Sequence, residues 1–271
     1  MNNVLRFMFF GDLIGKPGRG MFQKWAPILK KKFKIDAIIV NGENSSDIGR
    51  GITPPIANFL MESGANVITS GNHIWANKNI YEYINQNSNL IRPANYHASC
   101  PGKGYTFIDV NGYEVAIVNL LGKIFLKEQL DCPFRTMDSL LPLLKARTNL
   151  IFVDFHAEAT SEKEGLGFFL DGRVSAIVGT HTHVQTSDEK ILPNGTGYIT
   201  DLGFSGSINS MLGLRKEEIV RKLILQMPEK FVVEEKVGPF AITGAFVEVD
   251  VASGNTTHIE RFSITDEEFS V

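Results

Sequence analysis

The chain has 271 residues, of which 43% are hydrophobic, 27 are Lys or Arg and 30 are Asp or Glu, giving a formal net charge of -3. This charge provides no global positive field for holding a nucleic-acid duplex, although a small phosphorylated substrate is compatible with it. Cys100 and Cys132 lie far apart and outside any CxxC spacing, which argues against a disulfide framework or a thiolate metal site. The length is sufficient for a sizeable core, and we expect one α/β domain over residues 1–271.

The first residues, MNNVLRFMFFGD, contain an apolar run that is too short for a signal peptide. No stretch approaches the roughly 20 apolar residues of a membrane span. We therefore expect a soluble cytoplasmic protein with reduced thiols and no membrane partner.

Short apolar runs typical of buried strands recur along the chain. They cover Leu5–Phe10, Ala37–Val40, Val67–Thr69, Val115–Asn119, Leu150–Phe155 and Val174–Val178. Helical spacing or capping residues predict helices over Phe22–Phe33, from Thr53-Pro54-Pro55 onward, over Met137–Lys145 and over Lys216–Gln226. This alternation favours a largely parallel sheet that is covered on both faces. Ala241–Val251 and Thr257–Ile264 alternate around a Ser-Gly-Asn turn and predict a C-terminal antiparallel hairpin.

Polar side chains follow five of the predicted strands at the point where each strand ends. They are Asp12, then Glu43 and Asn44, then Asn72 and His73, then His156, and finally His181 and His183. The carboxyl ends of parallel strands open on one edge of a sheet, where ligands usually bind. The sequence therefore predicts that these five segments converge on one site.

Carboxylate, amide and imidazole groups without a thiolate suit Mn, Fe or Zn. Two divalent ions about 3.5 to 4 Å apart need a carboxylate to bridge them, and we assign that role to Glu43. His181 and His183 are two residues apart, so in extended backbone both rings point to the same side.

Each of these residues also has a simpler interpretation. Asp12 could cap a turn, Asn41-Gly42 and Gly71-Asn72 are common turn pairs, and His156 alone could be a hydrogen-bonded core histidine. Their joint occurrence at five strand ends favours the metal site. The Gly15–Arg19 segment stays open between a phosphate-binding helix start and a tight turn.

The motifs FFGDLIGKPGR, IVNGENSSDIGRGIT, ITSGNHIW, DFHAEATSEK and DGRVSAIVGTHTHVQT together resemble the calcineurin-like metallophosphoesterase superfamily. The resemblance is stronger to its YmdB-type branch of 2′,3′-cyclic-nucleotide 2′-phosphodiesterases, and it runs along almost the whole chain. The superfamily's DxH opening is Asp12-Leu-Ile14 here, and its bridging aspartate is replaced by Glu43. The branch shares both departures.

The resemblance implies a layered α/β/β/α sandwich, usually as a homo-oligomer, with metal ions at the sheet edge. We expect two divalent ions, Fe or Mn, with Zn also compatible. The resemblance also implies that Asp12, Glu43, Asn44 and His183 hold one ion, and that Glu43, Asn72, His156 and His181 hold the other.

The expected reaction is hydrolysis of 2′,3′-cyclic nucleotides to 3′-nucleotides by a metal-bridging hydroxide. His73 would protonate the leaving oxygen, a task for which an ordinary imidazole pKa near 6.5 is suitable. Two alternatives stay open: hydrolysis of other phosphomonoesters or diesters, and a regulatory protein that binds a nucleotide with little turnover.

Overall fold

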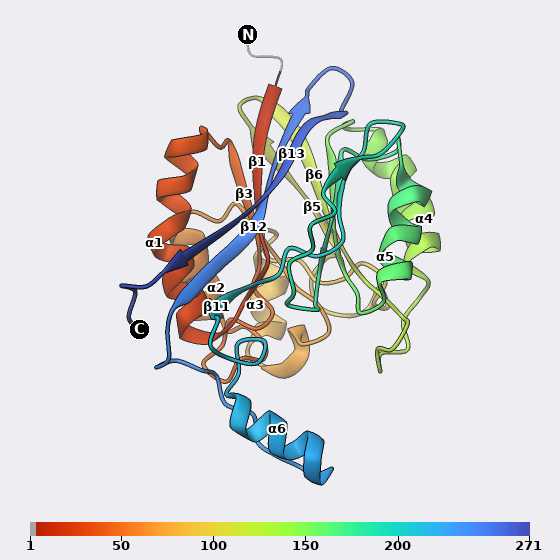
Figure 1. Ribbon diagram of the computed structural model, residues 1–271. Helices are drawn as coiled ribbons and strands as arrows, with labels where there is room; N and C mark the ends of the chain where they lie inside the picture. The colour runs from red at the N-terminus through yellow and green to blue at the C-terminus, as the bar shows by residue number, and fades with distance from the viewer. Residues whose placement is uncertain (1–3) are drawn as a thin grey trace.

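The computed structural model describes residues 4–271 and contains two mixed β-sheets stacked face to face (Figure 1). The first sheet contains β1 (Val4–Phe10), β2 (Asp12–Leu13), β3 (Ala37–Asn41), β4 (Val67–Thr69), β11 (Phe204–Ser207), β12 (Phe240–Asp250) and β13 (Thr256–Asp266). The second contains β5 (Tyr105–Val110), β6 (Tyr113–Leu121), β7 (Ile151–His156), β8 (Ala176–Thr180), β9 (Lys190–Ile191) and β10 (Gly197–Ile199).

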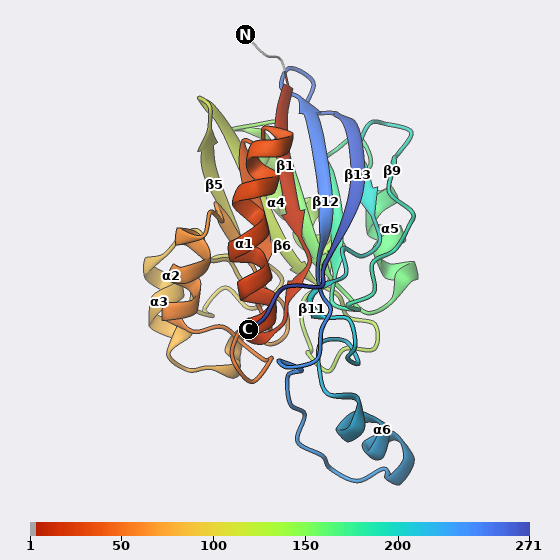
Figure 2. The same ribbon diagram turned by 60° about the vertical axis from the view of Figure 1, so that its left-hand side comes forward.

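Helices cover the outer face of each sheet (Figure 2). The helices beside the first sheet are α1 (Gly15–Phe33), α2 (Pro54–Glu62), the 3-10 turn η1 (Ile74–Ala76) and α3 (Ile80–Gln86). The second sheet is covered by α4 (Pro133–Lys145) and α5 (Thr160–Leu170). The expected α/β/β/α sandwich is therefore confirmed.

Three buried apolar layers hold these four layers of secondary structure together. Between the sheets, the Phe152 ring centroid lies 4.3 Å from that of Phe7 and 5.5 Å from that of Phe9. Under α1, Phe22 packs edge-on against Phe10 at 5.1 Å. The inter-sheet layer fixes the distance between the two strand edges that carry the polar clusters.

The expectation of one largely parallel sheet was wrong. Strands β1, β3 and β4 are parallel in the first sheet, and β6, β7, β8 and β10 are parallel in the second. Strand β12 pairs antiparallel with β1, so the C-terminal hairpin formed by β12 and β13 completes the first sheet. A strand between a helix layer and another sheet is apolar on both faces, as is a strand between two helix layers, so the local pattern cannot distinguish the two arrangements.

The predicted strands and helices are all present, and α1 differs most at its boundary. It begins at Gly15, whereas the apolar spacing first becomes evident at Phe22. Pro17 lies in the first turn, where its missing N–H is tolerated, and the glycines nearby conceal the helical pattern.

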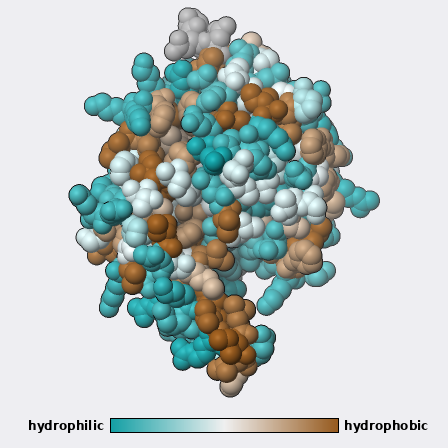
Figure 3. All heavy atoms as spheres, in the orientation of Figure 1, coloured by the Kyte–Doolittle hydropathy of each residue, from teal (hydrophilic) through white to brown (hydrophobic). Residues whose placement is uncertain are grey.

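Helix α6 (Lys216–Leu225) projects beyond the lower end of the sandwich, apart from the other helices (Figures 1 and 2). Apolar side chains gather on its surface (Figure 3). Across residues 4–271, no helix has both the length and the apolar character needed to cross a membrane.

Candidate metal centre

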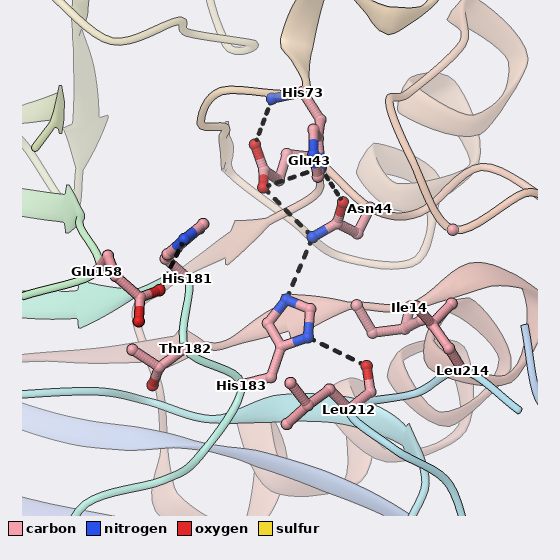
Figure 4. Close-up of a pocket in the computed structure, with 11 residues that line it drawn as sticks. Ile14, Glu43, Asn44, His73, Glu158, His181, Thr182, His183, Leu212 and Leu214 are labelled. Carbon is pink, nitrogen blue, oxygen red and sulfur yellow. Dashed lines mark hydrogen bonds and ion pairs between the residues drawn. The ribbon is translucent and has the colours of Figure 1, made fainter. Parts of the chain in front are cut away.

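The predicted site residues come together at the lower edge of both sheets, where β1, β3, β4, β7 and β8 end. Figure 4 shows Glu43 and Asn44 facing His73, with His181 and His183 approaching from the end of β8. Asp12 and His156 are fully buried beside them. Residues from both sheets therefore contribute to one polar cluster.

One half of this cluster is formed by Asp12, Glu43, Asn44 and His183. The Asn44 Nδ2 atom lies 3.3 Å from each of three atoms: Asp12 Oδ1, Glu43 Oε1 and His183 Nε2. His183 Nε2 and Asp12 Oδ1 are 3.6 Å apart. Two ligands of one ion with bonds near 2.1 Å are separated by roughly 3 to 4 Å, so Asp12 Oδ1 and His183 Nε2 are close enough to share an ion.

The other half is formed by Glu43, Asn72, His156 and His181. Glu43 Oε1 lies 2.9 Å from His156 Nε2, which in turn lies 3.0 Å from His181 Nδ1. The Oδ1 atom of Asn72 is buried without a hydrogen-bond partner among the described residues. A buried orphan carbonyl is costly, and a cation beside it would satisfy it.

Glu43 joins the two halves. Its Oε1 contacts both the Asn44 amide and the His156 ring, and its Oε2 accepts a 2.9 Å hydrogen bond from the backbone N–H of His73. Neighbouring Gly71 leaves room for this carboxylate, because a Cβ atom there would clash with Glu43 Oε2 and His156 Nε2. The geometry agrees with a bridging role for Glu43.

Hydrogen bonds outside the cluster set which nitrogen of each histidine faces inward. The backbone carbonyl of Leu212 can only accept, so His183 donates from Nδ1 at 3.1 Å and keeps Nε2 free. Thr180 donates its hydroxyl hydrogen to the Asp154 carboxylate at 2.7 Å. The Thr180 oxygen therefore accepts a hydrogen bond from His156 Nδ1. His181 Nε2 lies 3.1 Å from Glu158, which leaves Nδ1 free.

The result is that two imidazole lone pairs, on His156 Nε2 and His181 Nδ1, face each other across 3.0 Å. Without a cation, a proton must occupy one of them. Burial disfavours a charged His156 ring, but Glu43 and Asp12 outweigh burial and raise the pKa of His156 to about 9. Burial and the neighbouring His156 charge lower the pKa of His181 to about 3.

The carboxylates in the cluster stay ionised. Burial opposes the charge on Glu43, but the His156 charge and hydrogen bond lower the pKa of Glu43 to about 2. The pKa of Asp12 also lies below its usual range, because the charge and hydrogen bond of His183 outweigh the effect of burial. Ionised oxygens and free imidazole nitrogens together form a donor set that suits divalent transition metals.

The backbone at His181 and His183 was predicted to be extended, and this was wrong. Both residues adopt left-handed conformations, with φ of 101° and 63°. Thr182 between them donates both its N–H and its hydroxyl to Asp201 Oδ2, and this anchor bends the loop. The two rings consequently reach different halves of the cluster.

Asn44 presents its amide nitrogen to the other three groups, and its Oδ1 lies 2.7 Å from His73 Nδ1. An amide nitrogen does not ligate a cation. Asn44 as a ligand therefore stays a prediction, and ligation would require the amide to be reversed so that its nitrogen faces His73.

His73 lies at the rim of a cavity of about 320 Å³ beside the cluster. Its Nδ1 is held by Asn44, which leaves Nε2 as the unbonded ring nitrogen. Burial lowers the pKa of His73 below its ordinary value, and the Glu43 charge only partly opposes this. The expectation of an ordinary pKa was therefore wrong for the cluster without cations.

Sequence reasoning missed the buried polar residues that support the cluster. They are Asp154, Thr180, Lys163 and Asp201. Asp154 was detectable, because it is the only charged residue in the apolar strand β7 and lies two positions before His156, on the same face. The 2.6 Å ion pair between Lys163 and Asp201 joins segments 38 residues apart, and no local pattern reveals it.

Arg19 does not form an open phosphate site. Its guanidinium donates to the Ser45 carbonyl and to Asp47, the latter at 2.8 Å. Arg19 thus ties the start of α1 to the loop that carries Asn44, and the Gly15–Arg19 segment is the beginning of α1 itself rather than a tight turn before it.

The fold is of the metallophosphoesterase type, and comparison with known proteins agrees with it. A NAD nucleotidase of Haemophilus influenzae shares the fold alone, at a TM-score of 0.56 and 14% identity over 97% of this chain and 56% of its own. The model of the YmdB-like protein family matches residues 8–262, and the chain belongs to that family.

Two relatives are similar over nearly their whole length. A 2′,3′-cyclic-nucleotide 2′-phosphodiesterase of Bacillus subtilis is 46% identical over 97% of this chain and 98% of its own. The crystal structure of a phosphatase from Mycoplasma pneumoniae has a TM-score of 0.92 and 36% identity, covering 98% of this chain and 95% of its own.

Proposed function

We propose that this chain is a dinuclear-metal phosphodiesterase that hydrolyses 2′,3′-cyclic nucleotides to 3′-nucleotides. The observation that carries the proposal is the inward orientation of three histidine nitrogens, those of His156, His181 and His183, toward the ionised Asp12 and Glu43. Burying such a set costs free energy, which a proton on His156 offsets only in part and which bound cations would offset more fully.

Asp12, Glu43, Asn44 and His183 would hold one ion, and Glu43, Asn72, His156 and His181 the other. Fe or Mn suits these ligands, and Zn is also compatible with them. Two bound cations supply a water of lowered pKa for attack on phosphorus and neutralise charge on the phosphoryl oxygens. Substrate binding and proton transfer to the leaving oxygen are the tasks of the protein's own side chains.

His73 is the proposed general acid. Its Nδ1 is occupied by Asn44, so Nε2 is free to hold the proton that the leaving 2′ oxygen needs. The anionic phosphodiester beside the ring favours the protonated form, which counters the effect of burial on the pKa.

The cavity walls support a nucleotide as substrate. Ile14, Leu212 and Leu214 provide an apolar wall on which a base can pack, and the Glu158 carboxylate offers an acceptor to a ribose. The volume of about 320 Å³ is at the lower end of small-molecule sites. The name of the Bacillus subtilis relative adds support for this substrate class.

A panel of phosphoesters tests the proposal. Protein loaded with Mn or Fe is incubated with 2′,3′-cyclic AMP, 3′,5′-cyclic AMP, p-nitrophenyl phosphate and short RNA, and the products are separated by chromatography. We expect turnover of the 2′,3′-cyclic nucleotide to the 3′-nucleotide alone. Formation of the 2′-nucleotide, preference for a monoester, or tight nucleotide binding without turnover would each contradict it.

A further inference from the structure

Asp154 is a buried carboxylate that lies between the two sheets, next to the metal centre. It belongs to β7, two positions before His156, and is 3% exposed. Its Oδ1 accepts a hydrogen bond from the Thr180 hydroxyl at 2.7 Å. Its Oδ2 accepts from the Thr69 hydroxyl and from Asn41 Nδ2, the latter at 3.2 Å. The carboxylate therefore joins strand ends from both sheets.

Packing alone does not explain a carboxylate at this place. The hydrogen-bond partners of Asp154 are two hydroxyls and an amide, none of which is a cation. Burial raises the pKa of Asp154 to about 6, so at neutral pH the group is mainly ionised and only accepts hydrogen bonds. Burying a carboxylate without a cation is costly, and an apolar side chain would join the sheets at lower cost. The charge at Asp154 therefore indicates a role beyond packing.

A relay of two hydrogen bonds leads from Asp154 to a proposed metal ligand. Thr180 has one hydroxyl hydrogen, and this hydrogen points to Asp154. The Thr180 oxygen is left to accept, and it lies 2.9 Å from His156 Nδ1. A proton is thereby held on Nδ1 of His156. The other ring nitrogen, Nε2, faces Glu43 at 2.9 Å and His181 at 3.0 Å, and it is the one available to a cation.

The same carboxylate orients the residue that holds the proposed bridge. Asn41 directs its Nδ2 to Asp154, so its Oδ1 accepts from the backbone N–H of Glu43 at 3.1 Å. The Ser70 carbonyl can only accept, and its 3.3 Å hydrogen bond from Asn41 Nδ2 requires the same orientation of the amide. Asp154 thus acts on both sides of one proposed ion site.

We infer that Asp154 is a positioning residue, which holds the ring proton of His156 on Nδ1 through Thr180 and so presents Nε2 to a divalent cation. Asp154 itself would touch neither the cation nor the substrate. A carboxylate that only joined the sheets would have no preferred oxygen, whereas here the Oδ1 side alone leads to a ligand. The inference rests on the metal site of the proposed function and is independent of its substrate.

Asp154→Asn keeps the shape of the side chain but reverses the relay. An amide has one accepting and one donating end. Because Asn41 Nδ2 can only donate, the new carbonyl must take the place of Oδ2, and the new NH2 group then faces Thr180. Thr180 accepts from that group and turns its hydrogen to His156 Nδ1. The ring proton is then forced onto Nε2, the nitrogen that a cation needs.

Zinc titration of the full chain by calorimetry measures this effect without a substrate. We expect wild type to bind about two ions. Asp154→Asn should weaken one of them about 10- to 100-fold, as is usual for the outer hydrogen-bond partners of a ligand histidine. Thr180→Ser should bind zinc like wild type, because it keeps the hydroxyl of the relay.

Thr69→Val is the matched control, because Thr69 donates to the same carboxylate from the Oδ2 side and lies outside the relay. It should lower the free energy of unfolding, since a buried acceptor loses a donor, yet leave both zinc affinities unchanged. Equal losses of zinc affinity in Thr69→Val and Asp154→Asn, or no loss in Asp154→Asn, would overturn the inference.

Nuclear magnetic resonance of the zinc-loaded protein, with ¹⁵N-labelled histidine, tests the ring orientation directly. We expect His156 to carry its proton on Nδ1, seen as a slowly exchanging N–H, and to bind zinc through Nε2. Thr180→Val should shift this N–H resonance but not that of His183, which donates to the Leu212 carbonyl instead. Zinc bound at Nδ1 of His156, or an unshifted resonance in Thr180→Val, would contradict the relay.

Hydrolysis measured with the same preparations separates this inference from the proposed function. If Asp154→Asn loses zinc affinity as expected, but wild type loaded with Mn or Fe hydrolyses no 2′,3′-cyclic nucleotide, the proposed function fails and the relay stands. If wild type hydrolyses the cyclic nucleotide and Asp154→Asn binds zinc like wild type, the relay fails and the function stands.

Discussion

The ammonium group of Lys163 lies 2.6 Å from Oδ2 of Asp201, and both side chains are buried. The same oxygen accepts from the N–H and the hydroxyl of Thr182, at 3.1 and 2.8 Å. Thr182 separates His181 from His183, both of which have left-handed backbone conformations. Such conformations cost free energy and persist only where the surroundings enforce them. The Lys163–Asp201 pair is therefore the anchor that holds both histidines in place.

Replacing Lys163 by Met should lower the free energy of unfolding by about 3–5 kcal/mol, because it leaves the Asp201 carboxylate buried without its partner. Denaturant titration measures the change. The control is Lys190→Met, which removes an exposed ion pair with Glu164 and should cost no more than about 1 kcal/mol. A similar loss in the two variants would show that Lys163 is no anchor.

Gly71 should be indispensable for metal binding. A Cβ atom there meets Glu43 Oε2 and His156 Nε2, so Gly71→Ala should displace the bridging carboxylate and reduce the bound metal to at most about one ion per chain. Gly165→Ala on α5 is the control, since the nearest atom to its Cβ is 3.6 Å away. Elemental analysis compares the two, and full metal content in Gly71→Ala would contradict the packing argument.

Removing the proposed acid should separate catalysis from metal binding. His73→Ala should reduce kcat about 10²- to 10⁴-fold, because the leaving oxygen then departs without a proton. Metal content should not change, since His73 is outside both proposed ligand sets. Loss of an ion together with the histidine would make His73 a ligand and refute its role as acid.

Metal binding should release protons near neutral pH. In the absence of cations the pKa of His156 is about 9, so this ring carries a proton at pH 7, and the Asp12 charge outweighs burial and raises the pKa of His183, which favours a proton there too. A cation must displace them, so apparent affinity should rise about tenfold per pH unit for each displaced proton, up to about pH 9. Calorimetry in two buffers with different ionisation enthalpies counts the protons. A buffer-independent enthalpy at pH 7 would contradict these pKa shifts.

Local signals in the sequence were sufficient to locate the strands and the polar residues that follow them. The ends of β3 and β7 were identifiable because apolar runs stop abruptly at Asn-Gly-Glu-Asn and at His156. The distribution of the strands over two sheets depends on contacts such as Phe7 with Phe152, which are distant in the chain. Local periodicity contains no information about them.

Helix α5 shows why part of the supporting structure was not predicted. Glu162 and Lys163 are both buried on it, where an amphipathic pattern would require apolar residues. Glu162 accepts from the backbone N–H of Lys123, and Lys163 pairs with Asp201. Residues that serve the site thus interrupt the pattern by which their helix would be recognised.

The central claim is that the cluster around Glu43 holds two ions and that these ions are required for hydrolysis. Elemental analysis of anaerobically purified protein, combined with turnover of 2′,3′-cyclic AMP by the same sample, tests both parts. We expect about two Fe or Mn ions per chain. Turnover should disappear with a chelator and return when metal is added. One ion or none in a sample that is fully active, or activity that survives complete removal of metal, would contradict the account.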